Sequence, residues 1–167
     1  MTVGPNTYIT EPPARSDFAS LARNALERAC SGGPDPAPRY YSPRFVDHVN
    51  DLEFHGLEGA RLSVDLYKHM LSDLRITVEE QVVTGDRVAS RFVVTGSNRG
   101  RRVRFGGITI SRFENGLIVE DWSVTDTLGL LRQLGPWRSI LMGLEQWRTI
   151  ASASRRAAGP HTRNGAP

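Results

Sequence analysis

Cysteine and lysine are almost absent from this chain. Its 167 residues include one cysteine, Cys30, and Lys68 is the only lysine among 21 basic residues. A single cysteine excludes an intramolecular disulfide and any metal site built from several thiolates. Cys30 falls near the apolar face of an expected helix, where inert packing is the simpler role. The basic charge is carried by arginine, and a net charge of +3 does not by itself indicate a nucleic-acid partner.

The sequence also lacks any apolar run of the roughly 20 residues that a membrane-spanning helix needs. The first residues, MTVGPNTYITEPPARSD, contain neither an apolar stretch nor an early basic region, so no signal peptide is expected. We therefore expect a cytoplasmic protein with no membrane partner. The densest basic cluster surrounds an expected hairpin turn, which favours a solvated turn over a nucleic-acid site; it consists of Arg99, Arg101, Arg102 and Arg104.

What remains is an ordinary globular composition, 39% hydrophobic and 23% charged, which is enough for a sizeable core. Residues 1–15 and 152–167 have little hydrophobicity and are predicted to be flexible tails. A single domain is expected over residues 16–151.

Apolar residues at helical spacing predict several helices. One follows the capping residue Ser16, and a second amphipathic segment spans residues 56–72. Asp126 is placed to cap a short helix directly after it, and Pro136 opens a last helix.

Between the second and third helices the pattern changes to runs rich in Val, Ile, Phe and Thr, separated by turn residues. Asn115-Gly116 is the strongest hairpin signal among these turns. Helices followed by an antiparallel meander and closing helices predict an α+β fold. Two of the strands are apolar on both faces, so a homodimer through the sheet is expected. The predicted strands are residues 75–83, 87–95, 101–113 and 117–124.

Several segments together resemble one protein family. They are YYSPRFVDHV, TGDRVASRFVVTGSNRG, FENGLIVEDW and GLIVEDWSVTDTLGLLRQLG. In this order, over about residues 16–135, they are similar to the SnoaL-like polyketide cyclases of the nuclear-transport-factor-2-like superfamily. The combination is fairly specific for the family and poorly specific for the reaction.

The resemblance implies a cone-shaped α+β barrel, in which a curved antiparallel sheet wraps around N-terminal helices and C-terminal helices close it. Proteins of this kind close rings in polyketide biosynthesis, usually by intramolecular aldol chemistry and without a metal or organic cofactor. Relatives in the superfamily hydrolyse epoxides, form ethers from epoxides, isomerise steroids, assist hydroxylation or only bind.

The sequence departs from the aldol cyclases at the positions that carry their chemistry. The resemblance implies an aspartate, the general acid/base, directly after Trp122, where this chain has Ser123. A cavity histidine of the family is matched by Asn98, and another polar position on the third strand by Thr109. The resemblance therefore supports the fold of this chain more strongly than it supports the catalytic mechanism.

Asp121 is the first candidate for the missing acid or base. Side chains alternate along a strand, so Asp121 shares the face of Ser123, two positions further on. A carboxyl group in a dry pocket has a raised pKa, which makes it useful near neutral pH. The alternative is an exposed carboxylate at a strand end. Asp126 is the second candidate, and helix capping is its alternative role.

Asp47 and His48 are adjacent, so on a strand only one of them enters the pocket. His48 there would serve as an acid or base near neutral pH, or would be a core histidine bonded to the backbone. Tyr41, Tyr67 and Trp122 are expected to form flat pocket walls, with hydroxyl groups able to bond a carbonyl, although as aromatics they could equally be core residues.

Arg91 stands in the middle of an otherwise apolar strand. A buried arginine needs a carboxylate partner, and Asp121 or Asp126 would serve. Such a pair would lower the pKa of the carboxyl group and weaken it as a base. Alternatively, Arg91 binds an enolate or carboxylate of the substrate.

The resemblance implies a cofactor-free cyclase that acts on a polyketide-type small molecule, and the residues above make Asp121 the candidate acid/base, with His48 and Asp126 as further catalytic candidates. The histidines lack an ordered carboxylate pattern, so no metal is expected. The alternatives are an epoxide-opening cyclase or hydrolase, a binding or accessory protein without chemistry, and a protein-interaction module. The predicted substrate-binding residues are Tyr41, Asp47, Tyr67, Arg91, Asn98, Thr109, Trp122 and Ser123.

Overall fold

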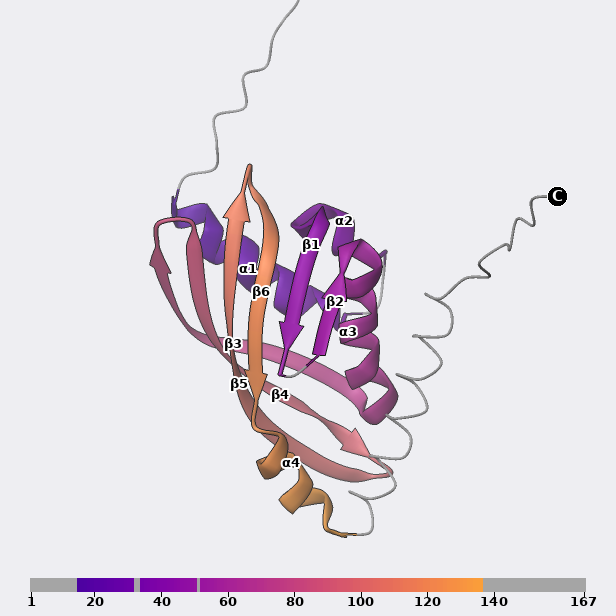
Figure 1. Ribbon diagram of the computed structural model, residues 1–167. Helices are drawn as coiled ribbons and strands as arrows, with labels where there is room; N and C mark the ends of the chain where they lie inside the picture. Colours follow the sequence, from indigo (N-terminus) through magenta and orange to yellow (C-terminus); the bar gives the residue numbers. More distant parts are fainter. Residues whose placement is uncertain (1–14, 32–33, 51, 137–167) are drawn as a thin grey trace, which may run out of the picture.

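One curved, unclosed sheet of six strands organises the fold, and helices α1 and α3 pack against one of its faces (Figure 1). The computed structural model describes residues 15–31, 34–50 and 52–136. The strands lie in the order β2-β1-β6-β5-β4-β3. They are β1 Tyr41–Val49, β2 Leu52–His55, β3 Ser72–Thr84, β4 Arg87–Asn98, β5 Arg101–Glu114 and β6 Leu117–Thr125.

The described residues form four helices, and three of them are the helices that the apolar spacing predicts. The first begins at Arg15, one residue before the predicted cap Ser16. Of the helix expected from Pro136 onward, only that first residue lies within the described part of the chain, and the predicted tails fall outside it apart from residue 15. The helices are α1 Arg15–Ala29, α2 Ala37–Tyr40, α3 Gly56–Met70 and α4 Thr127–Leu134.

The predicted strands all form, and local turn chemistry explains how they connect. Asn115 and Gly116 have φ angles of 51° and 79°. Positive φ at both central residues is what a type I′ hairpin turn requires, and Asn-Gly is the preferred pair there. This turn joins β5 to β6, the strand that carries Asp121.

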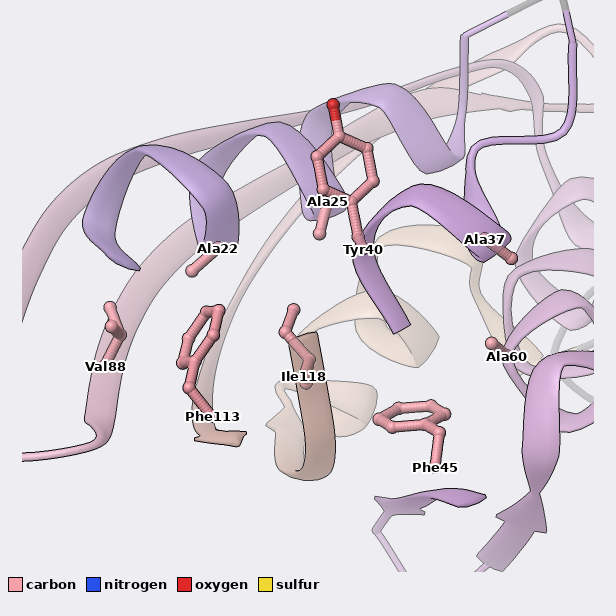
Figure 2. Close-up of a cluster of buried hydrophobic side chains, with 9 residues drawn as sticks. All are labelled: Ala22, Ala25, Ala37, Tyr40, Phe45, Ala60, Val88, Phe113 and Ile118. Carbon is pink, nitrogen blue, oxygen red and sulfur yellow. The ribbon is translucent and has the colours of Figure 1, made fainter. Parts of the chain in front are cut away.

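Buried side chains from α1 and the sheet form a first core cluster (Figure 2). Ala22 and Ala25 of α1 face Phe113 of β5 and Ile118 of β6, and these side chains point toward one another. The ring of Phe18 stacks on that of Phe113 with centroids 4.5 Å apart. Small residues on α1 allow the helix to approach the sheet closely enough for this dense packing.

A second core cluster lies toward α4, where Leu130 and Leu134 pack with Phe92 and Phe105. Gly107 of β5 makes room for one of these rings, because a Cβ atom at that position would lie 2.5 Å from Cζ of Phe92.

The element order and the single curved sheet confirm the predicted α+β class.

The sheet is mixed, where the sequence predicts antiparallel strands throughout. β1 and β6 are parallel neighbours, and their register sets Asp47 beside Asp121 and His48 beside Trp122. Because side chains alternate along a strand, the two aspartates lie on the helix-covered inner face and the other two residues on the outer face. The parallel pair therefore decides which side chains share a cavity.

Candidate active site

A cavity of about 70 Å³, here called the inner cavity, lies between the inner face of the sheet, α1 and α3. Apolar side chains such as Leu26, Phe92 and Val94 form much of its wall. Such surroundings strengthen electrostatic interactions and penalise unpaired charge. The polar residues that line it are Cys30, Tyr41, Asp47, Ser63, Tyr67, Asp121, Ser123 and Thr125.

Asp121, on β6, is the central acid of this cavity. Its side chain is buried, and among the described residues its Oδ1 is the one buried side-chain oxygen or nitrogen with no hydrogen-bond partner. Burial raises the pKa of Asp121 to about 8, the negative charge of Asp47 adds to the rise, and a hydrogen bond from Ser111 opposes it. Asp121 is therefore protonated at neutral pH, with one oxygen left for a ligand.

Asp47, on β1, is the second buried acid. Burial raises the pKa of Asp47 to about 6, while a hydrogen bond from Ser63 and the neighbouring His48 oppose the rise. The charge of Asp47 opposes the ionisation of Asp121, and the pKa of Asp47 is the lower of the two, so near neutral pH the two carboxyl groups carry one proton in total. Asp121 keeps that proton and Asp47 is ionised, which gives the cavity one acid and one base.

Hydroxyl groups surround the two carboxyl groups. Ser123 donates a hydrogen bond to Thr109, with Oγ and Oγ1 2.8 Å apart, and Thr109 is itself fully buried. The Tyr67 hydroxyl lies 3.4 Å from Oγ1 of Thr125. Burial raises the pKa of Tyr41, and the charges of Asp121 and Asp47 add to it, so its phenol stays protonated as a donor.

The structure thus brings Asp121, Asp47, Tyr41, Tyr67 and Ser123 together in one cavity. Thr109 contributes through its bond to Ser123 and is not itself part of the wall.

His48 and Trp122 lie elsewhere than expected. Both side chains are on the outer face, where their rings stack with centroids 5.4 Å apart. His48 Nδ1 lies 3.2 Å from Glu53 and Nε2 lies 3.3 Å from Glu120. Their strand neighbours Asp47 and Asp121 point inward, so alternation turns these two outward. The expectation that they line the pocket is wrong.

Arg91 also lies on the outer face and not beside an inner carboxyl group. Its guanidinium group pairs with Glu79 and, at 3.2 Å, with Glu80 on β3. About half of the side chain is exposed. The prediction that Arg91 is buried is wrong. Because β4 is apolar on both faces, its composition does not reveal which face the helices cover.

Asp126 and Asn98 have structural contacts instead of cavity contacts. Asp126 caps α4 as predicted, since its Oδ1 accepts a hydrogen bond of 2.8 Å from the amide of Gly129. Asn98 is buried, and its Nδ2 donates to the carbonyl oxygen of Met70 at 2.8 Å. Neither residue lines the inner cavity.

Sequence reasoning missed the pairing of the two aspartates and the part of Ser63, Ser111 and Thr125 in their surroundings. Thr125 has the same strand parity as Asp121 and Ser123, so alternation alone would have placed it on the inner face. No sequence signal predicts which strand lies beside β6, and Ser63 is brought to the site by α3.

Within residues 15–31, 34–50 and 52–136, no three His, Cys, Asp or Glu side chains gather as a metal site would require. No helix in the same ranges has the length and apolar character needed to cross a membrane.

Comparisons with known proteins concern the family and the fold. The model of the family described as SnoaL-like polyketide cyclase matches residues 20–134. TsrD from Streptomyces laurentii is 27% identical over 74% of this chain and 98% of that chain, with a TM-score of 0.62. Wild-type IdmH from Streptomyces antibioticus, assigned as a polyketide cyclase, is 26% identical over 74% of this chain and 100% of its own, with a TM-score of 0.62.

A third solved structure, AclR from Streptomyces galilaeus, is assigned as a hydroxylase. It is 23% identical over 73% of this chain and 98% of its own, with a TM-score of 0.64, which shows a shared fold. No curated protein matches the sequence of this chain.

Proposed function

Because the chain belongs to the SnoaL-like polyketide cyclase family, we propose that it closes a ring in a polyketide-type small molecule by general acid/base catalysis. Protonated Asp121 is the acid, and ionised Asp47 is the base. The supporting observation is the unpartnered Oδ1 of Asp121, buried beside Asp47 in an apolar cavity.

An intramolecular aldol closure uses one acid and one base. Ionised Asp47 removes a proton from the carbon next to a ketone, and the enolate attacks a second carbonyl group to form the new carbon–carbon bond. Protonated Asp121 donates its proton to the oxygen that becomes the alcohol. The pair still holds one proton afterwards, and transfer from Asp47 to Asp121 restores the starting state.

The phenol of Tyr41 supports this sequence as a hydrogen-bond donor to the developing enolate oxygen. Its pKa is raised, so it stays neutral through the reaction. A preorganised donor in an apolar site stabilises a developing oxyanion more than water does, because it needs no reorganisation.

The test is deuterium exchange at the carbon next to the carbonyl of an aryl methyl ketone in D₂O, followed by proton NMR. We expect the wild-type protein to accelerate this exchange and the Asp47→Asn variant, which lacks the base, to lose about a hundredfold or more of that acceleration. Asp121→Asn is expected to lose part of it, since exchange needs the oxyanion to be stabilised. Asp73→Asn, which changes an exposed aspartate on β3, is the matched control. Equal rates in all four proteins would contradict the mechanism.

Epoxide opening is the second candidate, and the acid–base pair favours it specifically. A protonated carboxyl group donates to the epoxide oxygen while an ionised one takes the proton of the attacking hydroxyl group. Catalysed opening of an aryl epoxide without any ketone exchange would select this reaction. Tight binding of both compounds with turnover of neither would instead favour a ligand-binding or accessory protein.

A further inference from the structure

A second depression adjoins the inner cavity and is here called the outer groove. It lies among the helices and is not part of the outer face of the sheet. Its volume is about 290 Å³, and it lies between the end of α1, α2 and α3. The outer groove and the inner cavity share the lining residues Ala29, Tyr41 and Val64. A ligand with one end at Asp121 can therefore extend past this common wall into the outer groove.

The volumes of the inner cavity and the outer groove suggest which part of a ligand each of them holds. The inner cavity measures only about 70 Å³. Sites for drug-sized ligands measure about 300–1,000 Å³. The inner cavity thus admits the reacting group of a polyketide-sized molecule, and the outer groove has the room for most of the remainder.

The charges of the inner cavity exclude an anion. Its described lining residues include two aspartates and no lysine, arginine or histidine. Asp47 and Asp121 already share one negative charge in apolar surroundings, so a second anion beside them would be strongly unfavourable. The end of a substrate that enters must be uncharged, as a ketone is.

Two basic and two acidic side chains line the outer groove, Arg61 and Lys68 with Asp35 and Asp65, and the two basic groups differ in how firmly they are paired. Arg61 is already engaged, by Asp35 at 2.9 and 2.6 Å and by Glu58 at 3.1 Å. Lys68 has a much looser contact, with Nζ 3.9 Å from Oδ1 of Asp65, and 45% of its side chain is exposed.

Lys68 also lies close to the junction of the two spaces. Its positive charge lowers the pKa of the Cys30 thiol, although burial has the larger effect and raises that pKa to about 11. Cys30 lines the inner cavity, while Lys68 itself lines the outer groove. The ammonium group is therefore near the point where a bound molecule would leave the inner cavity.

We propose that the outer groove is a second subsite, in which Lys68 binds the acidic group of a substrate whose uncharged carbonyl end lies at Asp121. The acidic group is a carboxylate or a phosphate ester. This inference rests on the proposed function for the role of the inner cavity. The loose pairing and position of Lys68 and the size of the outer groove carry the rest.

The test is isothermal titration calorimetry with three related ketones: an acetylnaphthoate, an acetylnaphthyl phosphate and the uncharged acetylnaphthamide. We expect Lys68→Met to raise the Kd of at least one anionic ketone about three- to tenfold, the size of one net hydrogen bond at a partly exposed site. The Kd of the amide should stay unchanged. Arg75→Met, which removes one positive charge from an exposed site on β3, should change none of the three.

The relative losses for the naphthoate and the phosphate identify the acidic group. An unchanged Kd for both anions in Lys68→Met, an equal loss for the amide, or wild-type protein that binds neither anion better than the amide would overturn the proposal. The Lys68 effect without catalysed ketone exchange or epoxide opening would remove the proposed function but leave the subsite. Catalysis without the Lys68 effect would remove the subsite alone.

Discussion

Asp47 and Asp121 are direct neighbours across the parallel pair β1 and β6, and both carboxyl groups enter the same apolar cavity. They lie 74 positions apart in the sequence, on the first and last strands. The charge of Asp47 raises the cost of ionising Asp121, beyond the cost of burial. A buried pair of like charges is unfavourable for stability, and such arrangements are found where a function requires an acid and a base together.

This cost predicts how stability changes with pH. The pKa of Asp121 rises from 3.8 to about 8 on folding, so between these values the folded chain binds more protons than the unfolded chain. Its contribution to the free energy of unfolding therefore falls as pH increases through this range, by at most about 1.4 kcal/mol per pH unit.

Asp121→Asn removes that dependence. We expect the free energy of unfolding of the variant to rise relative to wild type between about pH 4 and 8 and to level off above. Urea denaturation across this range measures it, with Asp73→Asn as the control. Parallel pH curves for wild type and Asp121→Asn would mean that the Asp121 carboxyl group is not buried in a raised-pKa state.

A double variant can place the carboxyl group at position 123 of β6 in place of position 121. Ser123 occupies the position at which the family resemblance implies the acid/base, on the same face as Asp121 and two residues away. We expect the Asp121→Asn/Ser123→Asp double variant to recover part of the ketone-exchange activity lost in Asp121→Asn. Ser123→Asn in the same background is the control. Equal activity in the two double variants would show that a carboxyl group at position 123 cannot replace Asp121.

Asp126 is expected to matter for stability and not for chemistry. Its side chain accepts the hydrogen bond from Gly129 at the start of α4, and replacing a helix cap by alanine costs about 1 kcal/mol. Asp126→Ala should lower the free energy of unfolding by about that amount in urea denaturation, and Asp126→Ser should restore most of it. A large loss of ketone exchange in a folded Asp126→Ser protein would reinstate a catalytic role.

A second copy of the chain is expected on the outer face of the sheet. Ile110 and Trp122 are neighbours there, as are Ile108 and Val124, and all four are substantially exposed. Charges of both signs beside this apolar surface are already paired, as in Arg112 with Glu120. A neutral, mixed rim suits a self-complementary contact better than it suits a strongly charged partner.

The Ile110→Glu variant tests this expectation by sedimentation velocity. It should shift the protein from dimer to monomer. Leu52→Glu is the control. Leu52 is similarly exposed, but it lies on the edge strand β2 at a position whose side chain alternates to the inner face, so this variant should remain a dimer. A monomeric wild-type protein at micromolar concentration would refute the prediction.

Local sequence patterns determined much of the fold. The Asn115-Gly116 turn, the capping of α4 by Asp126 and the helical spacing of the second amphipathic segment each depend on residues close together in the chain. Alternation along β6 also placed Asp121 and Ser123 on one face, and both line the inner cavity. These features follow from backbone geometry and side-chain chemistry over a few residues.

Only the tertiary structure decided which faces are covered and which strands are neighbours. From the sequence alone, His48 and Asp47 are equally plausible as the residue that enters the pocket. The packing of α3 over β1 covers the face on which Asp47 lies, so the aspartate points inward. Arg91 stands in an apolar strand but on the face that the helices leave open. The pairing of Asp47 with Asp121 arises from contact between distant segments. Burial, and with it the raised pKa of each acid, is a property of that contact and has no counterpart in the local sequence.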